Sequence, residues 1–423
     1  MVDLRITPSA ISSRMKIPTS KSHTLRALFF GMLGRGKSVI HSPLLSKDAD
    51  AMIQAIHQFG AVSEIKANSI EVEGGFHPAL DVIDAENSGI VYRFLAAAGA
   101  VLPSYTIITG DRSIRTLRPI EPLLGALTQL GAFAKTARGD GQAPILVKGP
   151  IKPGKCRLDG SDSQPVSALL NILSFLDGKS EVFVDDPKEE GWIDLSLSWL
   201  SRLGASIEHT DYRHYRIEGG LSYDGFSYRV PGDFSSALFP IAAALVTESR
   251  LLVEGLDPSD IQKDKVVIEL LQGMGANIEW QDKHLLVEPS PQLQGIEIDL
   301  NQAIDAFPIL AVIGCFAKGK TTLYNGAIAR KKESDRIRVM ANELKKMGAT
   351  IEEQEDGLIV QRSDLLGANL QSHGDHRVAM SLIVAALGAK GSSYLSGAEC
   401  IQKTYPQFIK EIGADIELDP LRV

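Results

Sequence analysis

Basic side chains recur in this sequence where apolar runs begin, a position that suits an anionic ligand. Lys21 opens the segment KSHTLRAL, in which Ser22 and Arg26 lie four residues apart, on one face of an expected helix. The other members of the set stand in LRPI, KKESDRI, GDHRVAM and QKTYP and are Arg118, Lys332, Arg336, Arg377 and Lys403. Arginine binds carboxylate and phosphate oxygens through two parallel hydrogen bonds. The set therefore predicts a small ligand that carries both kinds of anionic group.

Two carboxylates stand among these cations. Asp305 comes just before the apolar segment FPILAV, and Glu333 lies between Lys332 and Arg336. A carboxyl group positioned against a substrate can take a proton from a hydroxyl or deliver one to a carbon. We therefore predict that Asp305 and Glu333 are general acid–base residues.

Several of these residues belong to a series of polar heads that run directly into apolar segments. The heads are Lys21-Ser22, Asn87-Ser88, Ser163-Gln164, Ser235-Ser236, Asp305 and His376-Arg377, spaced 67 to 75 residues apart. The segments behind them are apolar nearly all round, which predicts buried helices whose first N–H groups can bind anions. Polar heads can also be simple N-caps, and for the two serines at 235 and 236 both interpretations stay open. Cations at a helix start oppose the helix dipole and require a negative partner.

A second series shows that the chain is built from six copies of one unit. In each copy an amphipathic segment ends in Gly-Ala and is followed by a short alternating stretch, with glycines at 60, 131, 204, 275, 348 and 413. Glycine accepts the left-handed conformation that ends a helix, and the alternation predicts a strand. Each unit should therefore contain one buried helix, one amphipathic helix and several strands. The sequence predicts an α/β (α+β) protein of repeated units.

Composition and charge restrict the class of protein. The 423 residues are 44% hydrophobic and 23% charged, an ordinary globular composition that at this length favours two domains. A net charge of −8 disfavours nucleic acid or an anionic membrane as the main partner, and three scattered cysteines predict neither disulfides nor a zinc cluster. MVDLRITPSA does not resemble a signal peptide, and no apolar run approaches the roughly 18 residues of a membrane span. We expect a cytoplasmic, soluble monomer.

One nucleotide-binding pattern is misleading. Residues 31–38, GMLGRGKS, satisfy the phosphate-binding loop consensus, which requires a preceding strand and a following helix. Here the preceding segment has helical spacing and the following SVIH is strand-like. We therefore interpret the segment as a helix end with solvated Arg35 and Lys37.

Taken together, the motifs resemble the 5-enolpyruvylshikimate-3-phosphate synthase family over essentially the whole chain. The matching segments are PTSKSHTLRAL, ENSGIVYR, LRPI, SDSQ, PGDFSSA, IDAFPILAV, KKESDR, GDHRVAM and QKTYP, in this order. The forms NSGI and DSQ resemble the chlamydial branch of the family.

The resemblance implies a two-domain fold, an inside-out α/β barrel with three βαβαββ-type units around buried parallel helices in each domain. One domain would span 21–231 and the other 1–20 with 232–423, with the active site in the cleft between them. It implies transfer of the enolpyruvyl group of phosphoenolpyruvate to the 5-hydroxyl of shikimate 3-phosphate, by addition–elimination with release of phosphate. No metal or organic cofactor is implied. Because both substrates are anions, we expect a strongly positive free site and closure of the domains on binding.

The resemblance also assigns roles to particular residues. The phosphoenolpyruvate site would consist of Lys21, Gly89, Arg118, Gln164, Arg336, Arg377 and Lys403, with Gly89 as a backbone wall. The shikimate 3-phosphate site would consist of Lys21, Ser22, Arg26, Ser161, Ser163, Gln164, Asp305 and Lys332. Asp305 would take the proton of the 5-hydroxyl. Glu333, with Lys21 or Lys403, would protonate the methylene carbon and later remove a proton from it.

This sequence departs from the family pattern at three positions. Asp162 stands where the family usually has serine, so Ser161 is the candidate replacement, and Glu189 stands where another phosphate-binding serine is common. A carboxylate beside a phosphate is repelled unless a cation intervenes, and each lost hydrogen bond to a charged group could cost about 1.5–3 kcal/mol. Ile90 replaces a usual threonine next to Gly89, which predicts weaker inhibition by glyphosate.

Other functions remain open at this point. A related enolpyruvyl transferase acts on UDP-N-acetylglucosamine, but it typically has Lys-Asn at the first site and a loop cysteine as acid, for which Cys156 is the nearest candidate. An unphosphorylated or different acceptor is the second alternative, because of Asp162 and Glu189. A binding protein without activity is the third, although such a protein has no evident need of an acid–base pair.

Overall fold

The computed structural model describes residues 2–290 and 292–418. The chain divides into two compact units, which we call the inner unit (Ser20–Val230) and the terminal unit (Met1–Thr19 with Pro231–Val423). Within the terminal unit the two chain segments that lead to the inner unit lie together. Thr19 and Gly232 form an isolated antiparallel bridge, and the Asp233 N–H donates to the Pro18 carbonyl at 2.9 Å.

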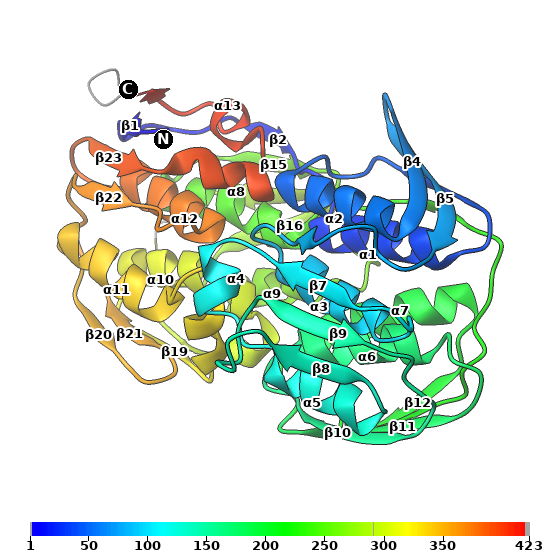
Figure 1. Ribbon diagram of the computed structural model, residues 1–423. Coiled ribbons are helices and arrows are strands. Elements are labelled where there is room, and N and C mark those ends of the chain that lie inside the picture. The colour runs from blue at the N-terminus through cyan, green and yellow to red at the C-terminus, as the bar shows by residue number, and fades with distance from the viewer. Residues whose placement is uncertain (1, 291, 419–423) are drawn as a thin grey trace. The chain divides into compact units, whose positions relative to one another are not determined.

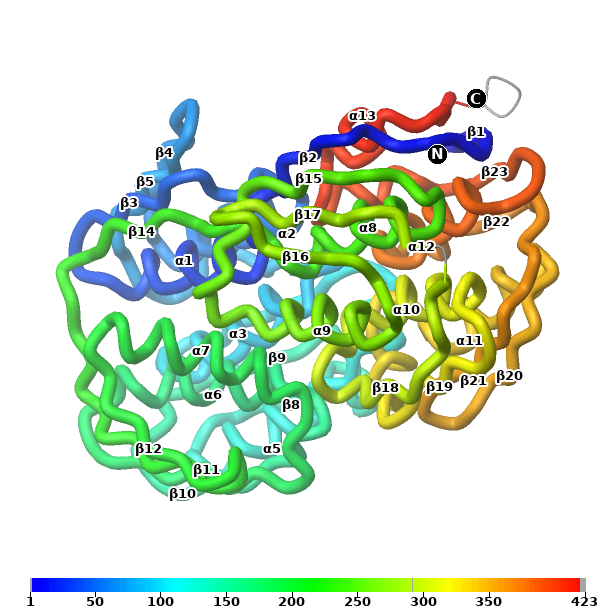
Figure 2. Tube along the Cα trace, turned by 180° about the vertical axis from the view of Figure 1, so that it is seen from behind, coloured from blue at the N-terminus to red at the C-terminus, as the bar shows by residue number. Residues whose placement is uncertain are grey.

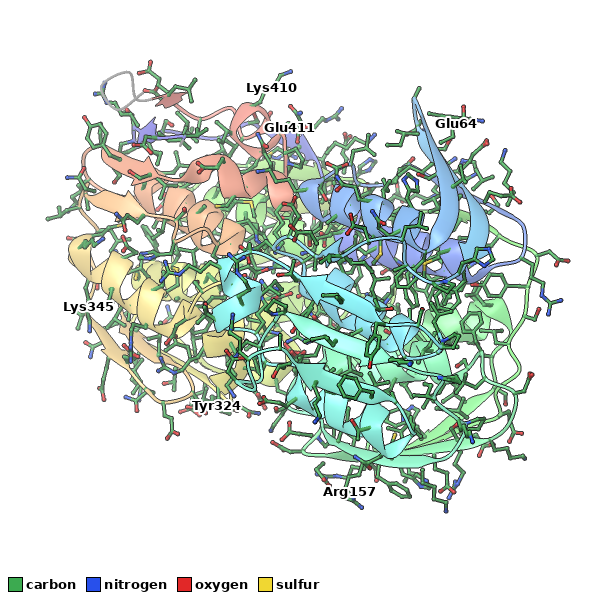
Figure 3. The ribbon with its side chains drawn as sticks, viewed as in Figure 1. Glu64, Arg157, Tyr324, Lys345, Lys410 and Glu411 are labelled. Atoms are coloured by element: carbon green, nitrogen blue, oxygen red, sulfur yellow. The ribbon has the colours of Figure 1, made fainter. Side chains whose placement is uncertain are left out.

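The inner unit contains three four-stranded sheets of one pattern (Figure 1). In each, a parallel pair is extended by an antiparallel hairpin. In sheet order the strands are β14 (Ser227–Arg229), β3 (Lys37–His41), β5 (Ser69–Phe76) and β4 (Gly60–Lys66); β6 (Ile83–Asp84), β7 (Thr106–Thr109), β9 (Ile145–Lys148) and β8 (Phe133–Thr136); β10 (Lys155–Asp159), β11 (Ser180–Asp185), β13 (His214–Ile217) and β12 (Ile207–Thr210). The β4–β5 hairpin, which carries Glu64, projects from its unit in Figures 1 and 3.

The helices of the inner unit fall into two classes. Buried helices are α1 (Lys21–Leu33), α3 (Gly89–Gly99) and α6 (Ser163–Leu173). Helices with one exposed face are α2 (Lys47–Gln58), α5 (Glu121–Gln129) and α7 (Glu190–Leu203), and α4 (Arg112–Thr116) is a short helix. α3 packs against α6, and α1 packs against α2 and α3. Burial of the apolar runs from three repeats therefore builds one core.

The terminal unit repeats this plan. Its sheets, in strand order, are β16 (Asn277–Gln281), β17 (His284–Glu288), β15 (Leu251–Glu254) and β2 (Arg14–Lys16); β18 (Glu297–Asp299), β19 (Lys320–Tyr324), β21 (Leu358–Gln361) and β20 (Ile351–Glu353); β22 (Asn369–Gln371), β23 (Ser393–Ser396), β1 (Leu4–Ile6) and β24 (Ile416–Leu418). Its helices are α8 (Phe234–Val246), α9 (Val266–Gly273), α10 (Phe307–Phe316), α11 (Arg336–Lys346), α12 (His376–Leu387) and α13 (Phe408–Glu411). Short 3-10 helices are η1 (Lys263–Lys265), η2 (Leu300–Gln302), η3 (Ile304–Ala306), η4 (Ala327–Lys331) and η5 (Ala398–Lys403). Figure 2 shows the same elements from behind.

The two sequence series account for this architecture. All six repeat glycines adopt a positive φ, from 65° to 102°, between an amphipathic helix and the strand that follows it. The six polar heads stand at or next to the starts of α1, α3, α6, α8, α10 and α12, which are buried along nearly their whole length. α8, α10 and α12 pack against one another. The predicted mixed α/β fold with repeated sheet–helix units is confirmed, and each sheet is open and four-stranded rather than part of a closed barrel.

The interpretation of the nucleotide-loop pattern is also confirmed. α1 ends at Leu33, Gly34 caps it, and β3 follows from Lys37, so helix precedes strand.

Within the residues that the structure describes, no helix has the length and apolar character needed to cross a bilayer.

Candidate active site

The terminal unit holds a cluster of charged side chains around the guanidinium of Arg336, which is 1% exposed. Arg336 donates to Asp375 from Nε at 2.8 Å and from Nη2 at 3.3 Å. Its Nη1 donates to Asp305 Oδ1 at 2.9 Å, and its Nη2 donates to Glu333 Oε2 at 2.8 Å. Three carboxylates that are far apart in the sequence therefore converge on one cation.

Helix starts position these groups. Asp375 is the N-cap of α12 and accepts the N–H of Arg377 at 2.9 Å, so that its other oxygen is directed to Arg336. Arg377 is the second residue of α12, and its Nη2 donates to Asp305 Oδ2 at 3.0 Å. Asp305 lies in η3, directly before α10. Its two oxygens thus accept from two different arginines.

A lysine completes the cluster from another element. Lys403 ends η5, is 5% exposed, and its Nζ donates to Glu333 Oε1 at 2.7 Å. Lys332 precedes Glu333 in the segment after η4 and acts on Asp305 through its charge. The structure therefore brings together every site residue predicted for this half of the chain.

The cluster sets the protonation state of its members. Burial alone would raise the pKa of Asp305, but the neighbouring cations, Arg377 foremost, outweigh burial and hold that pKa well below the usual carboxyl range. Burial would lower the pKa of Arg336, but the carboxylates around it, Asp375 foremost, raise that pKa above its ordinary value. Asp305 is therefore an anion at neutral pH, and with both arginines attached it is a weak base.

A further carboxyl group, Asp264, lies close to Asp305. It belongs to η1, is 3% exposed, and its Oδ2 has no hydrogen-bond partner. Burial and the charge of Asp305 raise the pKa of Asp264 to about 8. The pKa of Asp264 is therefore higher in the folded state than in the unfolded state. The free energy of unfolding should decrease as the pH rises from about 4 to 8, because in this range the unfolded state has lost this proton and the folded state still holds it.

Asp264→Asn is therefore expected to stabilise the protein at pH 8 by about 1–3 kcal/mol and to have little effect near pH 4. Urea unfolding of wild type and variant at a series of pH values measures this. A stabilisation that is the same at every pH would contradict the assignment, because a neutral Asp264 at low pH carries no charge to remove.

The inner unit holds a second cluster around Gly89, the first residue of α3. A Cβ atom built on Gly89 would lie 2.7 Å from Arg118 Nη1, 2.8 Å from Gln164 Oε1 and 2.9 Å from Arg93 Nη1. Arg93 Nη1 also donates to Gln164 Oε1 at 2.9 Å, and its Nη2 donates to the Pro119 carbonyl at 3.0 Å. The bare Gly89 backbone thus forms a wall against which two buried arginines and an amide are held.

Gly89→Ala is expected to raise the KM for phosphoenolpyruvate, the ligand expected at Arg118 and Gln164, by about tenfold. Both side chains must move away from the added methyl group. The φ angle of Gly89 is not left-handed, so the free energy of unfolding should change by less than about 1 kcal/mol. Gly125→Ala in α5 is the matched control, since a Cβ there meets nothing within 4 Å. Steady-state kinetics and urea unfolding check both variants; an unchanged KM for Gly89→Ala would contradict the wall.

Lys21 and Ser88 share one carboxylate. Lys21 Nζ lies 3.4 Å from Asp48 Oδ2, and the hydroxyl of Ser88, the N-cap of α3, donates to the same atom at 3.1 Å. Asp48 is buried in the first turn of α2. Lys21, the first residue of α1, is thereby tied to the start of α3.

Arg26 is a buried cation of a different kind. It is 2% exposed and donates to the Ser196 hydroxyl at 2.9 Å and to the carbonyls of Trp192 and Ser22, each at 3.2 Å. These acceptors are neutral, and burial lowers the pKa of Arg26 to about 9. Arg26 stays protonated at neutral pH, but the protein supplies it with hydrogen bonds rather than with an opposite charge.

The structure shows how this chain accommodates its unusual carboxylates. Asp162 is the N-cap of α6, accepts the N–H of Gln164 at 3.0 Å and lies 2.9 Å from Arg93 Nη2. Glu189 Oε2 accepts the N–H of Ser163 at 3.2 Å and its hydroxyl at 3.0 Å. Ser161 lies in the turn before α6, where its N–H donates to Asp159 at 2.8 Å.

Each cluster taken by itself contains carboxylates of the chain as well as cations. In the terminal unit Asp305, Glu333 and Asp375 oppose Arg336, Arg377, Lys403 and Lys332. In the inner unit Asp48 and Asp162 pair with Lys21 and Arg93. The negative partners that the helix-start cations require are therefore carboxylates of the chain itself.

Two of these carboxylates, Asp48 and Asp375, were not among the residues predicted from the sequence. Their sequence signal is weak but present, because Asp375 precedes the helical run HRVAMSLIVAAL as an N-cap does, and Asp48 follows Ser46, the N-cap of α2. Cys156, the alternative catalytic acid, lies inside β10 opposite Val182, is 2% exposed, and burial raises its pKa to about 12. It is not a loop cysteine, which counts against that alternative.

The fold and the clusters place the chain among the enolpyruvyl transferases. An EPSP synthase structure from Acinetobacter baumannii matches with a TM-score of 0.83 and 27% identity, covering 99% of this chain and 100% of that one. The enolpyruvyl transferase NikO from Streptomyces tendae shares the fold, with a TM-score of 0.80 and 17% identity over 99% of each chain.

Sequence comparison identifies the family. The model of the EPSP synthase (3-phosphoshikimate 1-carboxyvinyltransferase) family matches residues 6–412, and the chain belongs to this family. A 3-phosphoshikimate 1-carboxyvinyltransferase from Acetivibrio thermocellus is 42% identical over 98% of this chain and 99% of its own length. One from Chlamydia caviae is 43% identical over 97% of this chain and 93% of its own. The resemblance to chlamydial members is confirmed, and it extends with similar identity beyond that branch.

Proposed function

We propose that this protein transfers the enolpyruvyl group of phosphoenolpyruvate to the 5-hydroxyl of shikimate 3-phosphate and releases phosphate. The family match over residues 6–412 supports the reaction. The terminal-unit cluster carries the proposal at the level of residues. Its cations Arg336, Arg377 and Lys403 suit a carboxylate and a phosphate. They are held by Asp305 and Glu333, the two candidate acid–base groups.

Each substrate would be bound by residues of both clusters. The phosphoenolpyruvate-binding residues are Lys21, Gly89, Arg118, Gln164, Arg336, Arg377 and Lys403. The shikimate 3-phosphate-binding residues are Lys21, Ser22, Arg26, Ser161, Ser163, Gln164, Asp305 and Lys332. Closure of the units around both ligands would exclude water from the intermediate.

The ion pairs of the terminal unit support one order of events for this reaction. In the free protein Arg336 and Arg377 hold the pKa of Asp305 down, so Asp305 is a poor base. The anionic groups of phosphoenolpyruvate would draw both arginines to themselves, and the pKa of Asp305 would then rise. The donor substrate thus prepares the group that accepts the proton of the acceptor's hydroxyl.

Both chemical steps then use Asp305 and Glu333, the two carboxylates of the terminal-unit cluster. Glu333 delivers a proton to the methylene carbon while the 5-hydroxyl oxygen adds to the neighbouring carbon and Asp305 takes the hydroxyl proton. In the tetrahedral intermediate that carbon holds both oxygens and the phosphate. Glu333 then removes a proton from the new methyl group, the double bond re-forms, and the phosphate leaves with the proton that Asp305 had taken. Lys403, 2.7 Å from Glu333, stabilises its ionised state between the steps.

Phosphate release from phosphoenolpyruvate tests the proposal, with shikimate 3-phosphate, shikimate and UDP-N-acetylglucosamine supplied as separate acceptors. Turnover with shikimate 3-phosphate alone is the expected result. Turnover with shikimate or with the nucleotide sugar instead would contradict the proposed acceptor and would favour the alternative raised by Asp162 and Glu189.

A further inference from the structure

Glu189 places a carboxylate of the chain itself at the start of α6. Its Oε2 accepts both the N–H and the hydroxyl of Ser163, the first residue of the helix, at 3.2 and 3.0 Å. Glu189 is 3% exposed and Ser163 is 1% exposed. This is a pair of donors that a phosphate oxygen would use at a helix start, where the dipole also favours negative charge. Here a side chain of the protein has taken both.

The backbone holds Glu189 in this place. It directly precedes α7 and has φ 52° and ψ 40°, a left-handed conformation that is uncommon for a residue with a side chain. The N–H of Trp192 donates to the Glu189 carbonyl at 3.0 Å, which fixes the first turn of α7 to this conformation. The carboxylate is therefore delivered to Ser163 by a constrained segment rather than by a freely rotating surface side chain.

A buried cation stands at the same end of α7 without an opposite charge. Arg26 donates to the carbonyl of Trp192, in the first turn of α7, and to the hydroxyl of Ser196 one turn later. Among residues 2–290 and 292–418, no carboxylate forms an ion pair with Arg26. Glu189 is bound to Ser163 and does not neutralise Arg26. An incoming phosphate that displaced Glu189 from Ser163 would find a guanidinium that still lacks an anion.

We propose that Glu189 competes with the phosphate group of the acceptor for Ser163, and that it thereby sets how strongly the enzyme prefers a phosphorylated acceptor to an unphosphorylated one. This inference rests on the proposed function. In wild type the phosphate must replace the carboxylate of Glu189, which is already bound to Ser163. The free energy of phosphate binding is therefore less favourable than it would be at an empty helix start. An acceptor without a phosphate leaves Glu189 in place and is not affected.

The test compares Glu189→Gln, which keeps the shape and removes the charge, with wild type. Glu189→Ser, which places a small hydroxyl there, serves if the glutamine variant does not fold. Glu190→Gln is the matched control, because it removes the same charge one residue further along, at the first position of α7. In Glu189→Gln the KM for shikimate 3-phosphate should fall about tenfold, which is about 1.4 kcal/mol, while the KM for phosphoenolpyruvate stays within twofold of wild type. In Glu190→Gln both KM values should stay within twofold of wild type.

A second readout does not depend on turnover. Inorganic phosphate is titrated calorimetrically into wild type, Glu189→Gln and Glu189→Gln with Ser163→Ala. Tighter phosphate binding in the single variant that disappears in the double variant supports the inference; binding that is unchanged or weaker in Glu189→Gln overturns it. If wild type shows no turnover with shikimate 3-phosphate, the proposed function fails, and the phosphate titration alone still decides the role of Glu189.

Discussion

Arg336→Met is expected to lower the free energy of unfolding by about 3–5 kcal/mol at neutral pH and to weaken binding of phosphoenolpyruvate at least a hundredfold. The guanidinium is 1% exposed and is the shared partner of Asp375, Asp305 and Glu333. Without it, the buried Asp375 and the partly buried Asp305 and Glu333 face one another with too little positive charge. Urea unfolding and a direct phosphoenolpyruvate titration measure the two effects.

The pH dependence gives this prediction its sign. In wild type the depressed pKa of Asp305 contributes stability above the unfolded carboxyl pKa, and this contribution is lost as the pH falls through the folded pKa. In the variant the pKa of Asp305 rises instead, because Arg336 no longer opposes the effect of burial. The difference in the free energy of unfolding between variant and wild type should therefore be largest at neutral pH and should narrow towards pH 4. Arg338→Met is the matched control, since its side chain lies two residues further along α11, is 67% exposed, and should change stability by less than about 0.5 kcal/mol. A stability for Arg336→Met within 1 kcal/mol of wild type would contradict the central role of this cation.

The repeat was predictable because its signals are local. A glycine that must be left-handed and an apolar run that must be buried each act within a few residues, so six copies can be read one after another. The sheets were less predictable. β14 at Ser227–Arg229 pairs with β3, and β1 at Leu4–Ile6 joins strands from the far end of the chain. Such pairings depend on where the chain returns in space, which no local pattern records.

In the candidate site, too, local signals were predictable and long-range partners were not. Lys21 and Arg336 were predictable because cations are unusual at helix starts, whereas their partners Asp48 and Asp375 became evident only when neighbouring helices were seen together. Asp162 and Glu189 show the limit most clearly. From sequence both looked incompatible with a phosphate site, yet one forms an ion pair with Arg93 and caps α6 while the other holds Ser163. Only the three-dimensional structure separates these two roles.

The second large effect is expected for Glu333→Gln, which should lower kcat by about 10²- to 10⁴-fold and change the KM for phosphoenolpyruvate by less than about tenfold. Glu333 is in contact with both Arg336 and Lys403, at 2.8 and 2.7 Å, and its side chain is 9% exposed. The amide of glutamine keeps the shape and can accept a hydrogen bond from one of these two cations through its oxygen, but it cannot carry a proton to the substrate. The loss should therefore fall on the proton-transfer steps rather than on binding of the donor.

Proton transfer to the methylene carbon has a signature of its own. In deuterated water, with shikimate 3-phosphate present, wild type should exchange the methylene hydrogens of phosphoenolpyruvate for deuterium through the reversible methyl intermediate, and proton NMR follows this exchange. In Glu333→Gln the exchange should slow in parallel with kcat. Glu343→Gln is the matched control: Glu343 is 2% exposed on α11 but pairs with Lys346 and His373, so its substitution should reduce stability and leave exchange and kcat within about twofold. If exchange persists at the wild-type rate in Glu333→Gln while turnover collapses, the proton comes from another group, and Lys403, whose Nζ lies against Glu333, becomes the donor.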